Sequence, residues 1–124
     1  EWDVVLVGAG DLGSALLHYR GFTERGFKIT HVFDAASNKV GKQIVHYTVQ
    51  PMDELQATIQ THNIKMAMIA VPAEAAQHVT NLLVEAGVKA ILNYAPINLN
   101  VPQGVNVQYI DPVLHMQRMT YYIP

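Results

Sequence analysis

The sequence contains no cysteine, which excludes disulfides, thiolate catalysis and cysteine-ligated metal sites and is typical of a reducing compartment. It has no apolar run approaching about 18 residues, so it predicts no membrane-spanning helix. Lysine and arginine form no basic cluster, and the net charge is −2, so these residues are not expected to grip a nucleic-acid backbone themselves. We therefore expect a cytoplasmic protein with no membrane contact.

What the chain does have is apolar content: half of its 124 residues are hydrophobic, enough for one domain with a buried core. No repeat or low-complexity segment interrupts it. The sequence opens with Glu1-Trp2-Asp3 and enters an apolar run at once, without methionine or room for a signal peptide. Such a start indicates a fragment of a longer chain.

A glycine-rich turn joins this apolar run to a helix-like segment. Residues 4–7 are β-branched or leucine and uncharged, as in a strand buried on both faces of a parallel sheet. The turn that follows reads Gly8-Ala9-Gly10-Asp11-Leu12-Gly13, the GxGxxG pattern. Its glycines allow a tight turn, the close approach of a pyrophosphate and close helix packing. Helical spacing then predicts one apolar face, made of Leu12, Ala15, Leu16 and Tyr19. The pattern predicts a dinucleotide-binding turn with phosphates on the helix N-terminus.

An acidic residue ends the second predicted strand, residues 29–33. Asp34 lies 21 residues beyond Gly13, close to the spacing of about 20 expected for the acid that binds an adenosine ribose. A carboxylate there favours NAD over NADP, and nearby Lys39 softens that preference. The alternative is that Asp34 only ends the strand. We expect Asp11 to cap the helix, with its side chain turned away from the ligand.

Strand and helix patterns alternate along the rest of the chain. Further strands are expected at residues 44–49 (at the sheet edge), 65–71, 89–93 and 105–110, and helices at 51–62, 73–86 (ending at Gly87) and 112–122. The alternation predicts an α/β fold, a doubly wound Rossmann-type parallel sheet forming a single domain over residues 1–124.

Ligands of such sheets bind beyond the carboxyl ends of the strands. The segments expected there are the glycine turn, residues 34–39, Val71-Pro72-Ala73 and Asn93-Tyr94-Ala95-Pro96. We expect the first two to hold pyrophosphate and adenosine. The last two are expected at the nicotinamide, with an amide for its carboxamide and an aromatic ring and a proline beside its flat ring. For Val71-Pro72-Ala73 the alternative is a strand terminator without ligand contact.

The sequence predicts no catalytic residue and no metal site. None of the six histidines falls in a metal-ligand spacing, and there is no GxSxG, P-loop or pair of carboxylates in a plausible cleft. We therefore expect a binding protein rather than an enzyme.

Longer blocks of the sequence resemble the family of redox-sensing transcriptional repressors called Rex. They are GAGDLGSAL at residues 8–16, FD at 33–34 with KVG at 39–41, VPAEAAQ at 71–77, AGVKAILNYAP at 86–96, NLNVP at 98–102 and QRMTYY at 117–122. The resemblance covers essentially the whole chain, and its later blocks are more specific than the glycine turn.

The resemblance implies a homodimeric bacterial regulator. In this family an N-terminal winged-helix domain binds operator DNA, and a C-terminal Rossmann domain binds NADH or NAD+. NADH releases the repressor from DNA. The chain would be the Rossmann domain alone, without the winged-helix domain and without the C-terminal helix that subunits exchange. Tyr19 and Asp111 are implied to couple the cofactor to the subunit arrangement.

Two residues depart from the family pattern: Asp11 stands where Asn is usual, and Tyr94 where Phe is usual. Tyr94 adds a hydroxyl to an otherwise apolar ring pocket, which bears on the balance between the two cofactor forms. Because an apolar pocket penalises the charged ring of NAD+, we expect NADH to bind more tightly.

Two other functions stay open. One is the nucleotide-binding half of an NAD-dependent oxidoreductase, although such families commonly carry a lysine and a proline where this chain has Asn93-Tyr94-Ala95-Pro96. The other is a coenzyme A-binding domain of the succinyl-CoA ligase type, which shares the Val-Pro turn but does not need an acid at Asp34.

Overall fold

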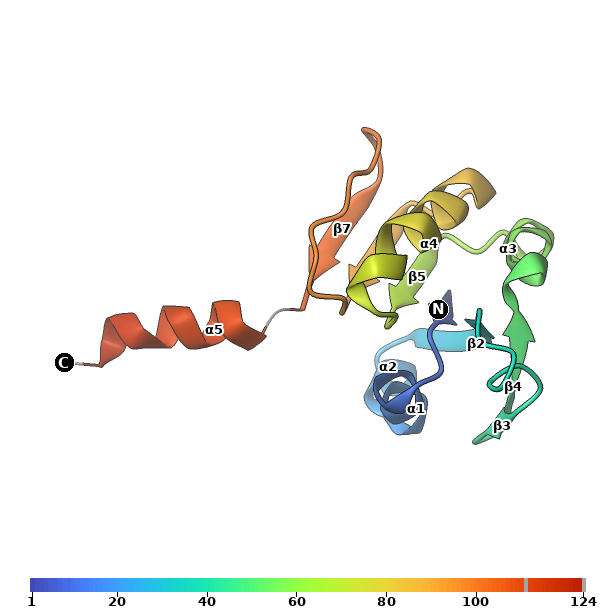
Figure 1. Ribbon diagram of the computed structural model, residues 1–124, viewed down its shortest axis with the longest axis horizontal. Coiled ribbons are helices and arrows are strands. Elements are labelled where there is room, and N and C mark those ends of the chain that lie inside the picture. The colour runs from blue at the N-terminus through green and yellow to red at the C-terminus, as the bar shows by residue number, and fades with distance from the viewer. Residues whose placement is uncertain (111, 124) are drawn as a thin grey trace.

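One seven-stranded sheet organises the chain (Figure 1). The computed structural model describes the backbone of residues 1–110 and 112–123, and the side chains of residues 1–110 and 116–123. The strands are β1 (Trp2–Val7), β2 (Phe27–Asp34), β3 (Gln43–Ile44), β4 (Tyr47–Pro51), β5 (Met66–Ile69), β6 (Ala90–Asn93) and β7 (Asn106–Tyr109). They lie in the order β3-β4-β2-β1-β5-β6-β7, and every neighbouring pair except β3 and β4 is parallel. The strand order reverses at β1, which confirms the predicted doubly wound, Rossmann-type fold.

Helices cover both faces of the sheet. They are α1 (Asp11–His18), α2 (Gly21–Glu24), α3 (Leu55–His62), α4 (Ala73–Ala86) and α5 (Pro112–Met119), with short 3-10 turns η1 (Met52–Glu54) and η2 (Thr120–Tyr122). Alternate residues of β1 supply the two cores, because successive strand side chains point to opposite faces. Val5 and Val7 pack with α3 and α4, whereas Val4 and Leu6 pack with α1.

Helix α1 buries a different face from the one predicted. Gly13, Leu16 and Leu17 are buried, whereas Leu12 and Tyr19 are 44% and 55% exposed. The apolar stripe is shifted because Gly13 sits directly against the turn, where a Cβ would overlap the Gly8 carbonyl. Tyr19 is not helical: it has extended backbone angles (φ −77°, ψ 125°) and leads into α2.

The edge strand predicted at residues 44–49 is instead a β-hairpin. β3 and β4 pair antiparallel, and Val45 between them has a left-handed φ of 57°. The Tyr47 hydroxyl donates to the Ile29 carbonyl at 2.8 Å and fastens the hairpin to β2. Pro51 ends β4, opposite Asp34, and is also the N-cap of η1, so the regular helix α3 begins at Leu55, later than predicted. The expectation of Gly87 as the end of α4 is confirmed, with φ 112° at its C-cap.

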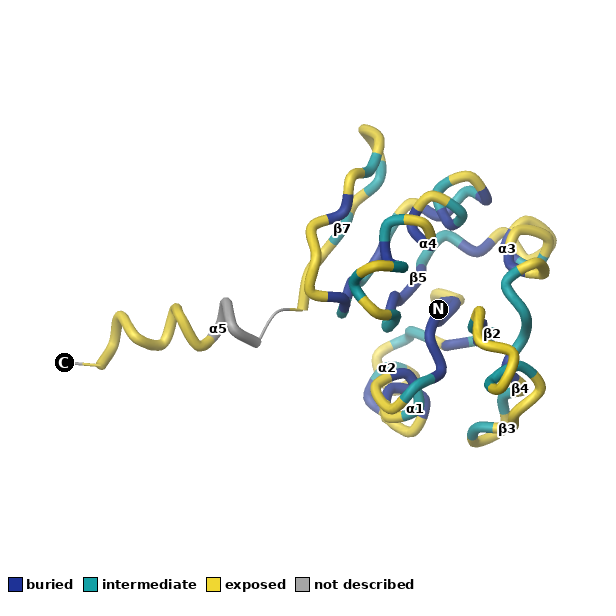
Figure 2. Tube along the Cα trace, in the orientation of Figure 1, coloured by how far each residue is buried: buried dark blue, intermediate teal, exposed yellow. Residues whose placement is uncertain are grey.

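Helix α5 extends away from the rest of the domain (Figures 1 and 2). Met116 and Met119 on α5 and Tyr122 beyond it are 60%, 53% and 88% exposed. On the sheet face that carries α1, a cavity of about 360 Å³ opens over β5, β6 and β7. Its walls are largely apolar and include Phe22, Met66, Met68 and Leu92. The domain thus has both a helix without a surface to cover and an apolar sheet face without a helix.

Candidate nucleotide-binding site

A cavity of about 550 Å³ opens beyond the carboxyl ends of β1, β2, β5 and β6. This volume lies in the usual range for small-molecule and cofactor sites. The residues predicted for the site that line the cavity are Gly8, Gly10, Asp11, Leu12, Asp34, Lys39, Val71, Pro72, Tyr94 and Pro96. All four predicted segments therefore meet in one place, at the point where the strand order reverses.

The three glycines of the turn have different surroundings. Gly8 has a left-handed φ of 112°, and a Cβ on it would overlap the backbone carbonyl of Ala70. A Cβ on Gly13 would overlap the Gly8 carbonyl, so both positions are closed by backbone. A Cβ on Gly10 would have no heavy atom within 4 Å. Gly10 is thus the one of the three whose missing side chain leaves open space beside the cavity.

Backbone amides at the start of α1 face this space. The first hydrogen bond of α1 runs from the Ser14 amide to the Gly10 carbonyl, at 2.9 Å. The preceding amides of the first turn have no intrahelical acceptor, and the helix dipole adds partial positive charge there. An anionic group such as a diphosphate is the natural partner for such an end.

The expectation that Asp11 caps this helix is wrong. Gly10 is the N-cap, no side chain caps the helix, and Asp11 is its first helical residue. A capping side chain must start one residue earlier, where the backbone is extended and the side chain can turn back over the amides. Asp11 is exposed and lines the cavity instead, so the cavity wall carries a carboxylate beside the unpaired amides of the first turn.

Asp34 joins the end of β2 to the glycine turn. Its Oδ2 accepts from the Ala9 amide and its Oδ1 from the Ala36 amide, both at 2.8 Å. Because an ionised carboxylate offers about four acceptor positions, each oxygen keeps a position for a ligand hydroxyl. Asp34 therefore ends its strand and also lines the cavity, so the two alternatives for this residue are compatible.

The loop after β6 is shaped by Asn93, whose side chain is completely buried. Its Nδ2 donates to the carbonyls of Ala95 and Ile97 at 3.2 and 3.0 Å, and its Oδ1 accepts from the Ala95 amide at 2.9 Å. The predicted hydrogen bond from this amide to a nicotinamide carboxamide is therefore wrong, because its polar atoms already serve the loop. Asn93 positions Tyr94 and Pro96, which do line the cavity. Burial raises the pKa of the Tyr94 hydroxyl, so this group stays protonated near neutral pH.

Ala9, Gly13, Ala73 and Ala95 are not among the lining residues. The Ala9 and Ala95 amides donate to the side chains of Asp34 and Asn93, and Gly13 packs against the Gly8 carbonyl. The sequence analysis missed Met52, Ala70, Ala75 and Val79, which complete the apolar wall. Ala75 lies in the 71–77 block of the family resemblance, and no motif marks the other three residues. Only the spatial order of the strands could have identified them.

The two residues implied to couple cofactor and subunits lie elsewhere. Tyr19 is outside the cavity, on the surface beyond α1, where its ring meets that of Phe22 edge-on at 5.0 Å. Asp111 lies outside the described residues. Among the residues that the structure describes, no three histidine, aspartate or glutamate side chains form a group suited to a metal ion, and no helix is long and apolar enough to cross a membrane.

Comparison with known proteins gives relatives over nearly the whole chain. The family model described as the CoA binding domain matches residues 1–97. The redox-sensing transcriptional repressor Rex of Carboxydothermus hydrogenoformans is 50% identical over 98% of this chain and 59% of its own length. The Rex protein of Streptomyces coelicolor is 44% identical over 98% of this chain and 47% of its own length. The chain thus spans about half to three fifths of the length of these relatives, and the resemblance to Rex is confirmed.

Solved structures agree. The Rex-family repressor RSP superimposes with a TM-score of 0.90 at 29% identity, over 98% of this chain and 58% of its own. RSP has also been solved in complex with β-NADH, and with β-NAD+ and operator DNA. A UDP-D-quinovosamine 4-dehydrogenase from Vibrio fischeri, at 18% identity and a TM-score of 0.65 over 94% of this chain and 86% of its own, shares the fold alone. The chain belongs to the CoA-binding domain family, and redox-sensing transcriptional repressors called Rex are among its relatives in sequence.

Proposed function

We propose that residues 1–124 form the dinucleotide-binding domain of a redox-sensing transcriptional repressor, which binds NADH and NAD+ in the 550 Å³ cavity. The observation that carries the proposal is that one cavity is lined by the glycine turn at Gly10, by Asp34 at the end of β2 and by the aromatic ring of Tyr94. This cavity lies where the strand order of the sheet reverses. The RSP complexes with β-NADH and β-NAD+ support it.

Each part of the dinucleotide would contact a different group of residues that line the cavity. The diphosphate would lie at Gly10 and the amides of the first turn of α1, because that is where open space meets unpaired donors. The adenosine ribose would bind the remaining acceptor positions of Asp34, with Lys39 nearby. The nicotinamide would lie between Val71-Pro72 and Tyr94-Pro96.

The part of the cavity between Val71-Pro72 and Tyr94-Pro96, here called the ring end, would discriminate between NADH and NAD+. NAD+ carries a positive charge on its ring that NADH lacks, and removing this charge from water into a largely apolar wall costs free energy. NADH is therefore expected to bind more tightly, with each 1.4 kcal/mol of difference giving about tenfold in affinity.

A complete regulator needs parts beyond this domain. Operator DNA would be bound by a winged-helix domain outside this chain, since RSP, which is longer, has been solved on operator DNA. NADH would release the full-length protein from the operator, in the bacterial cytoplasm. A homodimer is supported by the uncovered α5 and the uncovered apolar sheet face, which are surfaces that two copies can bury against each other.

The description of the matching family makes coenzyme A the second candidate ligand. Coenzyme A carries a phosphate on its adenosine ribose, and the Asp34 carboxylate in the wall would repel it. The oxidoreductase alternative finds less support, because the lining of the cavity contains two acids and no histidine among the described residues.

Calorimetric titration of the 124-residue chain with NADH, NAD+ and coenzyme A separates these functions. We expect NADH to bind more tightly than NAD+, and both to bind more tightly than coenzyme A. Equal dissociation constants for NADH and NAD+ would exclude the sensor. Preferential binding of coenzyme A, displaced only weakly by NADH, would establish the second candidate instead.

A further inference from the structure

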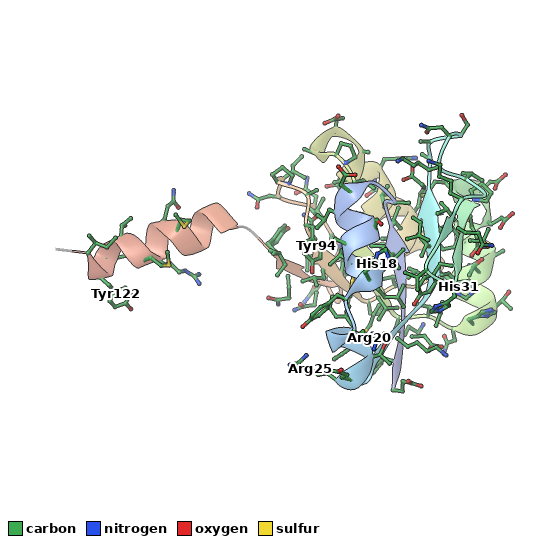
Figure 3. The ribbon with its side chains drawn as sticks, turned by 90° about the horizontal axis from the view of Figure 1, so that it is seen from below. His18, Arg20, Arg25, His31, Tyr94 and Tyr122 are labelled. Atoms are coloured by element: carbon green, nitrogen blue, oxygen red, sulfur yellow. The ribbon has the colours of Figure 1, made fainter. Side chains whose placement is uncertain are left out.

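The ring end of the cavity contains one polar group among apolar neighbours. Tyr94 is half-buried there, beside Val71, Pro72 and Pro96. Burial raises the pKa of its hydroxyl. The protonated phenol therefore presents a dipole and an electron-rich ring face, not a negative charge. Figure 3 shows Tyr94 on the compact part of the domain, away from Tyr122, which lies beyond the projecting helix α5.

A carboxylate lines the same cavity. Asp11 is the first residue of α1, and its side chain does not cap the helix, so its charge is not consumed by the amides beneath it. Of the other charged lining residues, Asp34 ends β2 and Lys39 follows it. β1 separates β2 from β5, so these groups lie about 10 Å from the ring end along the sheet edge. Asp11 opens the helix that follows β1, the strand next to β5, and it also lines a smaller cavity with Lys39 and Lys42.

NADH and NAD+ share their diphosphate and both riboses and differ by one positive charge on the ring. Only a wall group that interacts with this charge can change the ratio of their affinities. A carboxylate attracts the charge through space, and a phenol stabilises it through its oxygen and through the negative face of its ring. The apolar residues around them act in the opposite direction.

Building on the proposed function, we propose that Tyr94 and Asp11 are specificity-determining residues that favour the oxidised ring. They would reduce the preference of the cavity for NADH and so raise the NADH/NAD+ ratio at which the domain exchanges one form for the other. Apolar neighbours set the direction of the preference, and these two residues set its size.

Conservative variants of the full 124-residue chain test this proposal. Tyr94→Phe removes only the hydroxyl, and Asp11→Asn removes only the charge. Tyr121→Phe and Asp53→Asn are matched controls, because both residues are exposed and lie outside the cavity. The measurement is the ratio of the dissociation constants of NAD+ and NADH, obtained by calorimetry for each variant, with thermal unfolding monitored to confirm folding.

We expect each cavity variant to raise the ratio roughly threefold to tenfold over the original chain, and each control to leave it unchanged. For Tyr94→Phe the change should come mainly from weaker NAD+ binding, and for Asp11→Asn mainly from tighter NADH binding. The proposal fails if either folded cavity variant keeps the original ratio. Failure of the original chain to bind either form would instead overturn the proposed function itself, and with it this inference.

Discussion

Replacing Gly10 with alanine separates ligand binding from folding in this domain. Gly10 has φ −77° and ψ −157°, which alanine adopts without strain, and the added Cβ would meet no heavy atom within 4 Å. The free energy of unfolding should therefore change by about 0.5 kcal/mol or less. The methyl group would project into the space that the diphosphate needs.

The loss of binding can be worked from the amides involved. A diphosphate held off the turn by one methyl group loses one or two hydrogen bonds to a charged partner, each worth about 1.5–3 kcal/mol. We expect the dissociation constant of NADH to rise roughly 10- to 100-fold, measured by calorimetry beside a thermal unfolding curve. Gly13→Ala provides the contrast, since its Cβ would overlap the Gly8 carbonyl and should lower stability as well as binding. An unchanged dissociation constant in folded Gly10→Ala would refute the placement of the diphosphate on this turn.

Three further predictions concern single side chains. The Asp34→Asn side chain cannot accept hydrogen bonds from both backbone amides that the carboxylate now binds. The variant should therefore lose about 1–3 kcal/mol of stability and bind NADH at least about tenfold more weakly. Full retention of both properties would exclude a role of Asp34 in the turn and in ligand binding. Asn93→Ala should lower the free energy of unfolding, measured by chemical denaturation, by about 3 kcal/mol, because the buried side chain loses three hydrogen bonds. The exposed control Asn81→Ala should lower it by less than about 0.5 kcal/mol. Similar losses in the two variants would contradict the role of Asn93 in the loop. Burial, and then the neighbouring His62, lower the pKa of His31 below its ordinary value of 6.5. The free energy of unfolding should therefore fall as the pH drops through 6.5 and below, and His31→Gln should make this dependence on pH less steep. Parallel pH profiles of the two proteins would contradict this role of His31.

The sequence predicted the parts of the fold that depend on periodicity and on glycine chemistry. The strand, turn and helix around Gly8 and Gly13 follow from local patterns, and so does the end of α4 at Gly87. The meeting of four segments in one cavity also follows, because parallel strands bring their carboxyl ends to one edge. These features are encoded by neighbours in the chain, which makes them visible without a structure.

The errors arose where tertiary contacts decide. The hairpin at residues 44–49 requires a left-handed Val45, which a β-branched residue rarely adopts, and it is fastened by a hydrogen bond from Tyr47 across to β2. The role of Asn93 could not be predicted either, since an amide at a strand end reads the same whether it faces a ligand or its own loop. The buried stripe of α1 is displaced by one position because the helix axis is set by contact with Gly8.

Under the proposed function, α1 and the loop after β6 would respond to different parts of the dinucleotide. Helix α1 is eight residues and so about 12 Å long, with the unpaired amides of its first turn at one end and the exposed Tyr19 just beyond the other. Because NADH and NAD+ carry the same diphosphate, the backbone amides of α1 would report only that the cavity is occupied. The two redox forms differ at the ring, which the proposed function places beside Tyr94. Tyr94 continues directly from β6, and β6 forms part of the uncovered apolar sheet face. A ligand shifts an equilibrium only through contacts that differ between its states. Under the proposed function, the loop after β6, rather than the amides of α1, would therefore be the element that carries the oxidation state of the dinucleotide toward a partner subunit.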